Sequence, residues 1–234
     1  MKSYLPPTQE IGDLFVEEVI GMGCVSPDVC DSGMALYARA FFSPPAKILP
    51  GDAVQGGVAL RAIGELVDVH PFVYRQVCTN GAVLAETLES RHIKRVDMAA
   101  PTVAINATLA EIRLALRGCA HPSVFDGAAE AMRRATRQPA TVVAALVMGG
   151  PGWKHLAAHL LQEALSRFED DTDRSAFGLM NAITSLARDT RDPEHRWRLE
   201  ELGGGVLALI TPRRKSGPSA RTLEEDDAFI DVCA

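Results

Sequence analysis

The stretch VQGGVALRAI (Val54–Ile63), followed by Gly64-Glu65 and then by LVDVHPFVYRQV (Leu66–Val77), does most to decide the fold. Both segments are rich in β-branched and aromatic residues, and each is long enough for a strand. Gly64-Glu65 is suited to a tight turn between them. Asn80-Gly81 indicates another turn, because both residues tolerate a positive φ. The quoted stretch therefore predicts two consecutive strands with a turn on either side of the second.

Further strands are predicted before and after this stretch. Met34–Phe42 (MALYARAFF) alternates and is rich in large residues, and a fourth strand is expected at Arg91–Val96. Ser43–Gly51 contains three prolines and a glycine, which indicates a turn or an extended connector. Before all of these, Thr8–Gly21 has apolar residues at helical spacing and predicts an amphipathic helix.

The pattern becomes helical after Pro101. Trp153–Phe168 has the clearest apolar stripe, and Asp192-Pro193 is a good N-cap and first-turn pair. We expect Gly203–Gly205 to end the helix that begins there. The elements predicted in this half are helices at 105–116, Ser123–Arg137, Trp153–Phe168, Ser175–Arg188 and Asp192–Leu202, and a last strand at Val206–Ile210.

This order of elements predicts an α+β fold, with an antiparallel sheet from the N-terminal half packed with a helical C-terminal half. We expect a single domain over residues 1–211, strand-rich over 34–98 and helical over 102–202. The remaining residues, 212–234, are expected to form a mobile charged tail, basic first and then acidic.

The composition excludes several classes of protein. Hydrophobic residues make up 47% of the 234 residues, which is enough for a sizeable core. The N-terminus has no basic segment followed by an apolar one, and the apolar run Val142–Met148 is far shorter than the roughly 20 residues of a membrane span. Five widely spaced cysteines favour reduced thiols over a disulfide framework. We expect a cytoplasmic protein that does not contact a membrane.

Charge is unevenly distributed along the chain. The formal net charge is −6, yet residues 91–137 contain 8 basic and 4 acidic side chains. Several of these arginines recur at a spacing of four on predicted helices, and the planar guanidinium suits phosphate recognition. The alternative is a solvated surface paired with acidic neighbours. The candidate nucleic-acid-binding residues are Arg91, Lys94, Arg95, Arg113, Arg117, Arg133, Arg134 and Arg137, with Tyr74 as a platform on which a base could stack.

No motif in the sequence assembles a catalytic centre or a cofactor site. There is no GxSxG, and neither glycine cluster forms a P-loop or a GxGxxG. His155 and His159 lie four apart, as metal ligands on one helix would, but no glutamate follows the first of them and no third ligand is evident. The cysteine pairs lack a CxxC spacing. We expect no catalytic residue, no cofactor and no metal, with His155 and His159 as weak candidates for a metalloenzyme.

At Val69–Glu86 the chain is VHPFVYRQVCTNGAVLAE. This segment resembles the signature of the phage/plasmid-like proteins grouped as domain of unknown function 932, in which an aromatic-Arg element precedes Val-Cys-x-Asn-Gly. Where that family has a polar turn, this chain has Arg61–Gly64. The family is uncharacterised, but its members occur on mobile elements, so the resemblance implies a role near DNA metabolism or host conflict. The motif residues expected to be structural are Arg75, Cys78, Asn80 and Gly81, with Cys78 a buried thiol rather than a nucleophile.

These observations predict a non-catalytic nucleic-acid-binding protein of a mobile element. The expected ligand is single-stranded DNA in recombination or replication, bound by a homo-oligomer. The acidic and apolar tip Glu224–Ile230 is similar to segments that recruit a protein partner to single-stranded-DNA-binding proteins. The alternative function is a homo-oligomeric scaffold or protein-interaction component that does not bind nucleic acid.

Overall fold

The computed structural model describes residues 6–24, 27–42, 46–49, 52–75, 80–85, 87, 89–94, 100–141 and 156–210. The predicted tail and three candidate residues, Cys78, Arg95 and His155, lie outside these ranges. The first half contains α1 (Thr8–Gly21), β1 (Asp28–Asp31), β2 (Ala35–Phe41), β3 (Ala46–Leu49), β4 (Asp52–Ile63), β5 (Leu66–Arg75), β6 (Asn80–Val83) and β7 (Arg91–Lys94). The second half contains α2 (Pro101–Cys119), α3 (Pro122–Ala135), α5 (Ala158–Asp170), α6 (Ala176–Asp189) and α7 (Pro193–Ile210).

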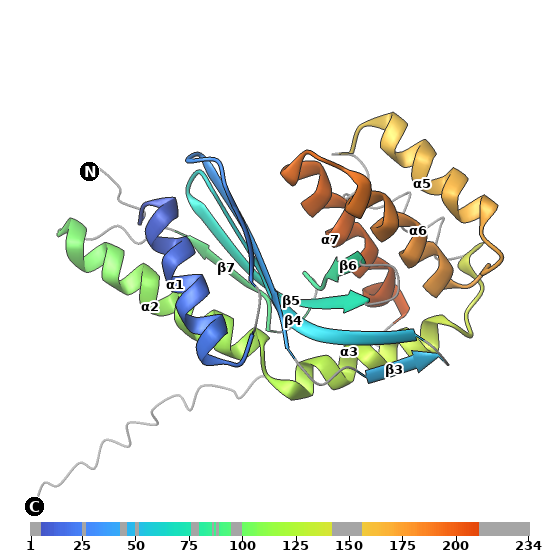
Figure 1. Cartoon of the computed structure of the whole chain (residues 1–234), viewed down its shortest axis with the longest axis horizontal. Helices are drawn as coiled ribbons and strands as arrows, with labels where there is room; N and C mark the ends of the chain where they lie inside the picture. Colours follow the sequence, from blue (N-terminus) through green and yellow to red (C-terminus); the bar gives the residue numbers. More distant parts are fainter. Residues whose placement is uncertain are drawn as a thin grey trace, which may run out of the picture.

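The described strands form one antiparallel sheet, so the predicted α+β class is confirmed. Its strand order is β1-β2-β4-β5-β6, and β3 pairs with β4 while β7 pairs with β5. Figure 1 shows α1 and α2 on one side of the sheet and α5, α6 and α7 on the other, while α3 packs against β3, β4 and β5. The tight turn between β4 and β5 is where the sequence placed it, and Gly64 adopts a φ of 57° there.

Asn80 and Gly81, predicted as a turn, are instead the first residues of β6. Gly81 pairs with Tyr74 of β5 in the ladder, and a Cβ atom at Gly81 would overlap the ring of Phe72. The glycine is therefore required for close packing in the sheet rather than for a positive φ. The prediction of a turn at these two positions was wrong because a local signal cannot distinguish the two uses of glycine.

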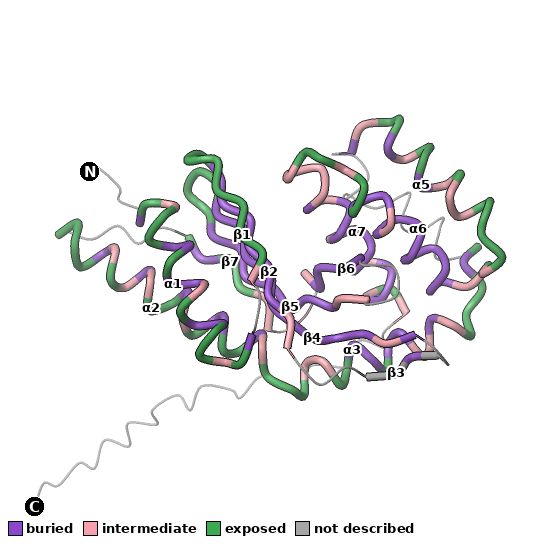
Figure 2. The backbone as a smooth tube through the Cα atoms, viewed as in Figure 1, coloured by how far each residue is buried: buried purple, intermediate pink, exposed green. Residues whose placement is uncertain are grey.

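The two faces of the sheet differ in chemistry. Leu36, Val58, Leu60 and Val69 lie on one face and pack against α1 and α2 in a continuous apolar cluster. The opposite face, in contrast, has Tyr37, Arg39, Arg61, Asp68 and His70, and all five are buried. Figure 2 shows that buried residues dominate β2, β4, β5, β6 and α6, whereas β1 and the outer surfaces of α1, α2 and α5 are exposed.

The helix α7 covers part of this polar face and corrects two predictions. The sequence predicted that Gly203–Gly205 would end the helix and that Val206–Ile210 would be a strand, but α7 continues through both to Ile210. A Cβ atom at Gly204 would overlap the backbone oxygen of Val83 in β6. The glycines therefore permit close packing and do not stop the helix.

The remaining helices follow the sequence closely. The bounds of α1 are those predicted, and Ser175 caps α6 by accepting a hydrogen bond from the backbone N–H of Gly178 at 3.2 Å. The helix predicted from Trp153 begins later, because Leu156 and Ala157 are not helical and α5 starts at Ala158. No helix in the described part of the chain is both long enough and apolar enough to cross a membrane.

Candidate functional site on the polar face of the sheet

Strand register gathers charged side chains into a row across four strands. Tyr37 of β2 is opposite Arg61 of β4, Arg61 is opposite Asp68 of β5, and Asp68 is opposite His92 of β7. Side chains directly opposite each other on antiparallel strands share a face and lie within contact distance. Arg61 donates a hydrogen bond to Asp68 Oδ2 at 2.6 Å, and His92 Nδ1 lies 2.7 Å from Asp68 Oδ1. Both oxygens of the Asp68 carboxylate are therefore engaged.

A second row lies two residues along each strand and hence on the same face. It contains Asp28 of β1, Arg39 of β2, Ala59 of β4 and His70 of β5. The small Ala59 side chain leaves room above the sheet for the indole of Trp197 from α7, which is completely buried. The guanidinium carbons of Arg39 and Arg61 lie 5.9 and 5.4 Å from the centroid of this indole ring.

Carboxylates from α7 neutralise the two arginines of the sheet. Arg39 Nη2 lies 2.7 Å from Glu200 Oε2, and Arg61 Nη1 lies 3.2 Å from Glu194 Oε1. Tyr37 also donates its hydroxyl proton to Glu194, over 2.9 Å. Burial raises the pKa of Glu200 although Arg39 opposes the shift. Because a buried ion pair leaves an uncompensated charge when one partner is lost, this network makes the attachment of α7 to the sheet depend on every member.

Burial alone would raise the pKa of Asp68, but hydrogen bonds from His92 and Arg61 outweigh it and leave the pKa below its ordinary value. Asp68 is therefore a carboxylate at neutral pH. Tyr37 shows the opposite balance, since burial and its hydrogen bond to Glu194 both raise its pKa. It remains a neutral hydrogen-bond donor.

His70 differs from the other polar residues of the two rows in its hydrogen bonding. It is completely buried, and neither of its ring nitrogens has a hydrogen-bond partner in the described part of the chain. Burial lowers the pKa of His70 to about 4, so the imidazole is neutral near neutral pH. Its ring lies edge-on to that of His92, with the centroids 5.2 Å apart. Native structures rarely leave a buried donor and acceptor unsatisfied in this way.

A cavity of about 180 Å³ opens farther along the same face. Three arginines and two acids line it, together with the stacked rings of Phe41 and Tyr74, whose centroids are 4.5 Å apart. Asn80 lies in its wall, where its Nδ2 donates to Thr184 at 2.6 Å and its buried Oδ1 has no described partner. The charged residues of the wall are Arg39, Arg188, Arg196, Asp28 and Glu200.

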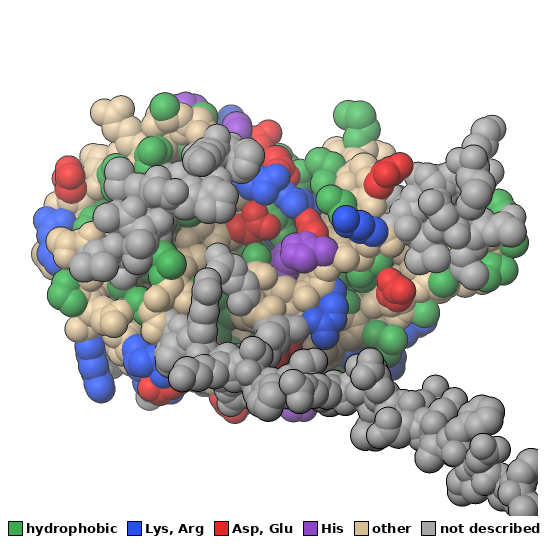
Figure 3. Space-filling view, turned by 180° about the vertical axis from the view of Figure 1, so that it is seen from behind, with side chains coloured by type: hydrophobic (Ala, Val, Ile, Leu, Met, Phe, Trp, Pro, Cys, Tyr) green, Lys and Arg blue, Asp and Glu red, His purple; other side chains and the backbone are tan. Residues whose placement is uncertain are grey.

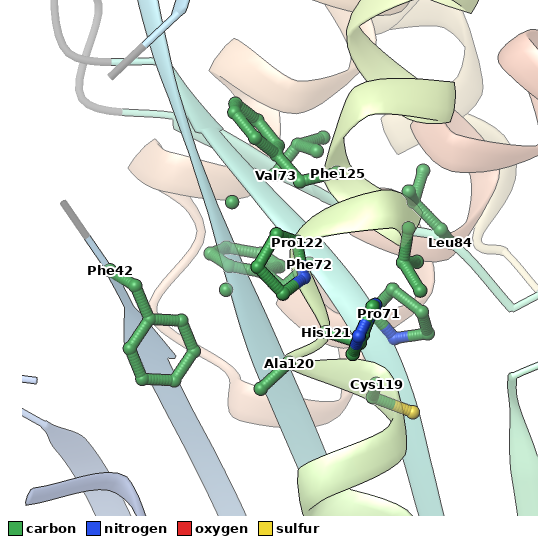
Figure 4. A pocket seen from close by; sticks show the side chains of 13 residues that line it. Phe42, Pro71, Phe72, Val73, Leu84, Cys119, Ala120, His121, Pro122 and Phe125 are labelled. Carbon is green, nitrogen blue, oxygen red and sulfur yellow. The ribbon is translucent and has the colours of Figure 1, made fainter. Parts of the chain in front are cut away.

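The other cavity, of about 120 Å³, has a mostly apolar wall (Figure 4). Phe42, Phe72 and Phe125 line it, with Cys119 and His121 at one side. Cys119 donates to the backbone oxygen of Glu89 at 3.0 Å, and burial raises the pKa of its thiol to about 12. A thiol with this pKa is a poor nucleophile. This cavity is small and lacks convergent charged groups, so we assign no site to it.

The arginines predicted from the sequence occupy three separate elements. Arg113 and Arg117 of α2 both bind the carboxylate of Glu18 in α1, and Arg133 and Arg134 of α3 both pair with Glu130. Arg91 and Lys94 lie exposed on β7, and Arg137 lies exposed after α3. On the face shown in Figure 3, Lys and Arg side chains are scattered and interspersed with Asp and Glu. Four of the predicted arginines thus have acidic partners, as the alternative interpretation anticipated.

The other predicted residues are close to the cavity or engaged in packing. Tyr74 is half-buried in the stack that lines it, and Gly81 is in its wall. Arg75 donates to both oxygens of Asp52, at 2.7 and 2.8 Å. His159 is exposed on α5, and no metal-binding group of three or more residues in the described chain includes it.

Sequence reasoning missed Arg39, Arg61, Asp68, His70 and His92. One signal was available, because Asp68 and His70 are separated by one residue within a predicted strand and must share a face. His92 could not be placed beside them without the register of β7, which pairs with β5 and not with its neighbour in sequence, β6. Comparisons with models of protein families, with curated proteins and with solved structures found no match for this chain.

Proposed function

We propose that the protein binds single-stranded nucleic acid and catalyses no reaction on it. The observation that carries this proposal is the cavity of about 180 Å³ on the polar face, where Arg39, Arg188 and Arg196 face Asp28 and Glu200. Three guanidinium groups and two carboxylates line the cavity, and Arg188 is also paired with Asp189 of its own helix at 2.8 Å. A guanidinium can donate two hydrogen bonds to one phosphate, which matches the ligand class.

The size and the aromatic wall of the cavity favour a nucleic-acid strand over a free cofactor as the ligand. Pockets that enclose a whole small molecule usually measure at least about 300 Å³. A cavity of about 180 Å³ admits one phosphate or the edge of one base, while the rest of a polymer stays outside. Tyr74, half-buried against Phe41, provides an aromatic ring beside the arginines, as stacking platforms for single strands do. The resemblance to phage/plasmid-like proteins favours the same class of ligand.

Fluorescence anisotropy with a labelled single strand and a labelled duplex, at low and at physiological salt, tests this proposal. We expect binding that prefers the single strand and weakens as salt increases, because bound phosphates release counterions. Arg188→Ala should weaken binding at least about threefold, as loss of one phosphate contact does. Arg133→Ala is the matched control, since both arginines are similarly exposed (39% and 42%) and pair with an acid on their own helix.

Three outcomes would overturn the proposal or move its site. Absence of binding even at low salt would discard the ligand class. Equal effects of Arg188→Ala and Arg133→Ala would show that the cavity does not make the contact. If instead the charge reversal of Arg113 and Arg117 to glutamate alone abolishes binding by a folded protein, the surface lies on α2, where the sequence first placed it.

One observation favours the second candidate, a homo-oligomeric scaffold. Met34, Ile63 and Leu66 are exposed by 84%, 40% and 37%, and strand pairing brings them to the same end of the sheet. Neighbouring exposed apolar side chains are typical of protein interfaces. Light scattering after size exclusion should then show a defined oligomer that Met34→Asp dissociates. A monomer at all concentrations would contradict this function.

A further inference from the structure

The starting point is the imidazole of His70. A neutral imidazole always has one N–H donor and one acceptor nitrogen. Both nitrogens of His70 are buried without a partner in the described part of the chain. Leaving buried polar groups unpaired is costly, and such groups in a native protein are usually completed by a water or an ion. The charged side chains of the two rows have oppositely charged neighbours, whereas His70 has both of its ring nitrogens unpaired.

Two further ligands converge on the same point. A carboxylate oxygen of Asp68 and a ring nitrogen of His92 lie with a ring nitrogen of His70 such that all three atoms are within 4.8 Å of one another. Two imidazoles and one carboxylate form a ligand set that divalent transition metals prefer. Magnesium and calcium favour oxygen ligands and fit this set less well.

The surroundings fit a cation. Arg61 donates to Oδ2 of Asp68 at 2.6 Å, which fixes the carboxylate and leaves Oδ1 directed toward His92. Ligated carboxylates are usually held by such an additional hydrogen bond. Glu201 interacts electrostatically with both Asp68 and Arg61, although burial raises its pKa. Asp68, which is a carboxylate at neutral pH, balances part of the charge of a dication.

One ligand of the site, His92, is exposed to solvent and can change its position. Oδ1 of Asp68 and Nδ1 of His92 are 2.7 Å apart, whereas two ligands at about 2.0 to 2.1 Å from a tetrahedral zinc ion lie roughly 3.3 Å apart. His92 must therefore move outward by roughly 0.6 Å. Its side chain is 62% exposed on β7, so this shift meets little resistance. The exposed His92 leaves this side of the cluster accessible from solvent.

We propose that Asp68, His70 and His92 form a binding site for one divalent transition-metal ion of the zinc or cobalt class. The ligands come from β5 and β7, so the ion joins the four-residue strand β7 to the sheet. This proposal is independent of nucleic-acid binding, because its residues do not line the cavity of Arg39, Arg188 and Arg196.

Titration of the metal-free full-length protein with Co²⁺ and Zn²⁺ tests the site, with Mg²⁺ as the comparison ion. We expect one equivalent of Co²⁺ to bind with the visible absorption of a low-symmetry site, and Zn²⁺ to displace it. His92→Ala should weaken binding at least about tenfold without unfolding the protein, because the side chain is exposed. His92→Cys should restore tight binding, since a thiolate is also a zinc ligand.

His159→Ala is the matched control, because His159 is also an exposed histidine of the described chain but lies on α5. It should bind the metal as the unaltered protein does. Binding no tighter than that of Mg²⁺, or equal affinity of His92→Ala and the unaltered protein, would overturn the proposal. A loss of binding in His159→Ala would overturn it equally and would move the metal to α5. Circular dichroism of each variant confirms that the comparison is between folded proteins.

Discussion

Replacing Gly204 with alanine should destabilise the protein, whereas the same change at Gly205 should stabilise it. Both positions are in α7, and neither has a positive φ. A Cβ atom at Gly205 would meet nothing within 4 Å, whereas one at Gly204 would overlap the backbone oxygen of Val83 in β6. The two variants therefore add the same methyl group to the same helix in opposite surroundings.

The magnitudes follow from two effects. Alanine is favoured over glycine inside a helix by about 0.5 to 1 kcal/mol, and both variants gain this amount. Overpacking costs about 1 to 3 kcal/mol, and the upper end applies at Gly204 because the overlapping atom belongs to the backbone of a strand. We therefore expect Gly205→Ala to be more stable than the unaltered protein by about 1 kcal/mol and Gly204→Ala to be less stable by about 2 kcal/mol.

Urea denaturation followed by circular dichroism measures both free energies of unfolding, and the two variants should differ by about 3 kcal/mol. In a thermal scan, this difference corresponds to roughly 6 to 12 °C between the midpoints. If both variants are stabilised equally, α7 does not pack closely on β6 through Gly204. If both variants are destabilised, the glycines have the positive φ of residues that end a helix, as the sequence alone predicted.

Three further predictions concern buried or charged side chains away from these glycines. Burial alone would raise the pKa of Glu18, but hydrogen bonds from two arginines of α2 leave the pKa below its ordinary value. Glu18→Gln should therefore cost most stability above about pH 4.3, and this cost should shrink as the pH falls below that value. A difference in urea denaturation that does not depend on pH would contradict this prediction. Iodoacetamide should alkylate the exposed Cys30 in the native protein, but Cys119 only after denaturation. If peptide mass spectrometry finds both cysteines modified in the native protein, Cys119 is not buried. Arg39→Met should lower the free energy of unfolding by about 3 kcal/mol, the lower end for a broken buried pair, because Glu200 loses Arg39 but keeps Arg196 at 3.2 Å. The double variant Arg39→Met with Glu200→Met should recover part of this loss, and a double-variant cost equal to the sum of the two single costs would refute the pairing.

The fold was largely predictable because its strands and helices have strong local signals. The two long strands β4 and β5 were visible from their β-branched and aromatic residues, and Gly64 marked the turn between them. Periodicity and caps located the first residues of the helices to within a few positions, as at Ser175, whereas the end of α7 was predicted eight residues too early. The failures at Asn80-Gly81 and at Gly203–Gly205 have one cause, since in each case a glycine is needed where another segment passes too closely for a Cβ atom.

The candidate site was much less predictable, because it depends on which strands are neighbours. Arginines at a spacing of four attracted attention on α2, yet Arg113 and Arg117 are neutralised by Glu18, which is distant in sequence. The polar face, in contrast, is produced by the cross-strand pairs of β2, β4, β5 and β7. Asp68 and His70 share a face by strand geometry alone, but His92 joins them only through a pairing that skips β6.

The charged network and the histidine cluster have different physical explanations, although they share one face of the sheet. Arg39 and Arg61 have acidic partners from α7 or the sheet, so cohesion between helix and sheet accounts for them without any ligand. Cohesion does not account for His70, because an apolar side chain of similar size would fill the same space without leaving two ring nitrogens unpaired. A buried polar group that weakens the fold needs another reason to be there, and two adjacent metal-ligating groups within 4.8 Å supply one. The ion pairs beneath α7 are thus explained by the fold, whereas the proposed metal ion would explain the histidine cluster on the same face.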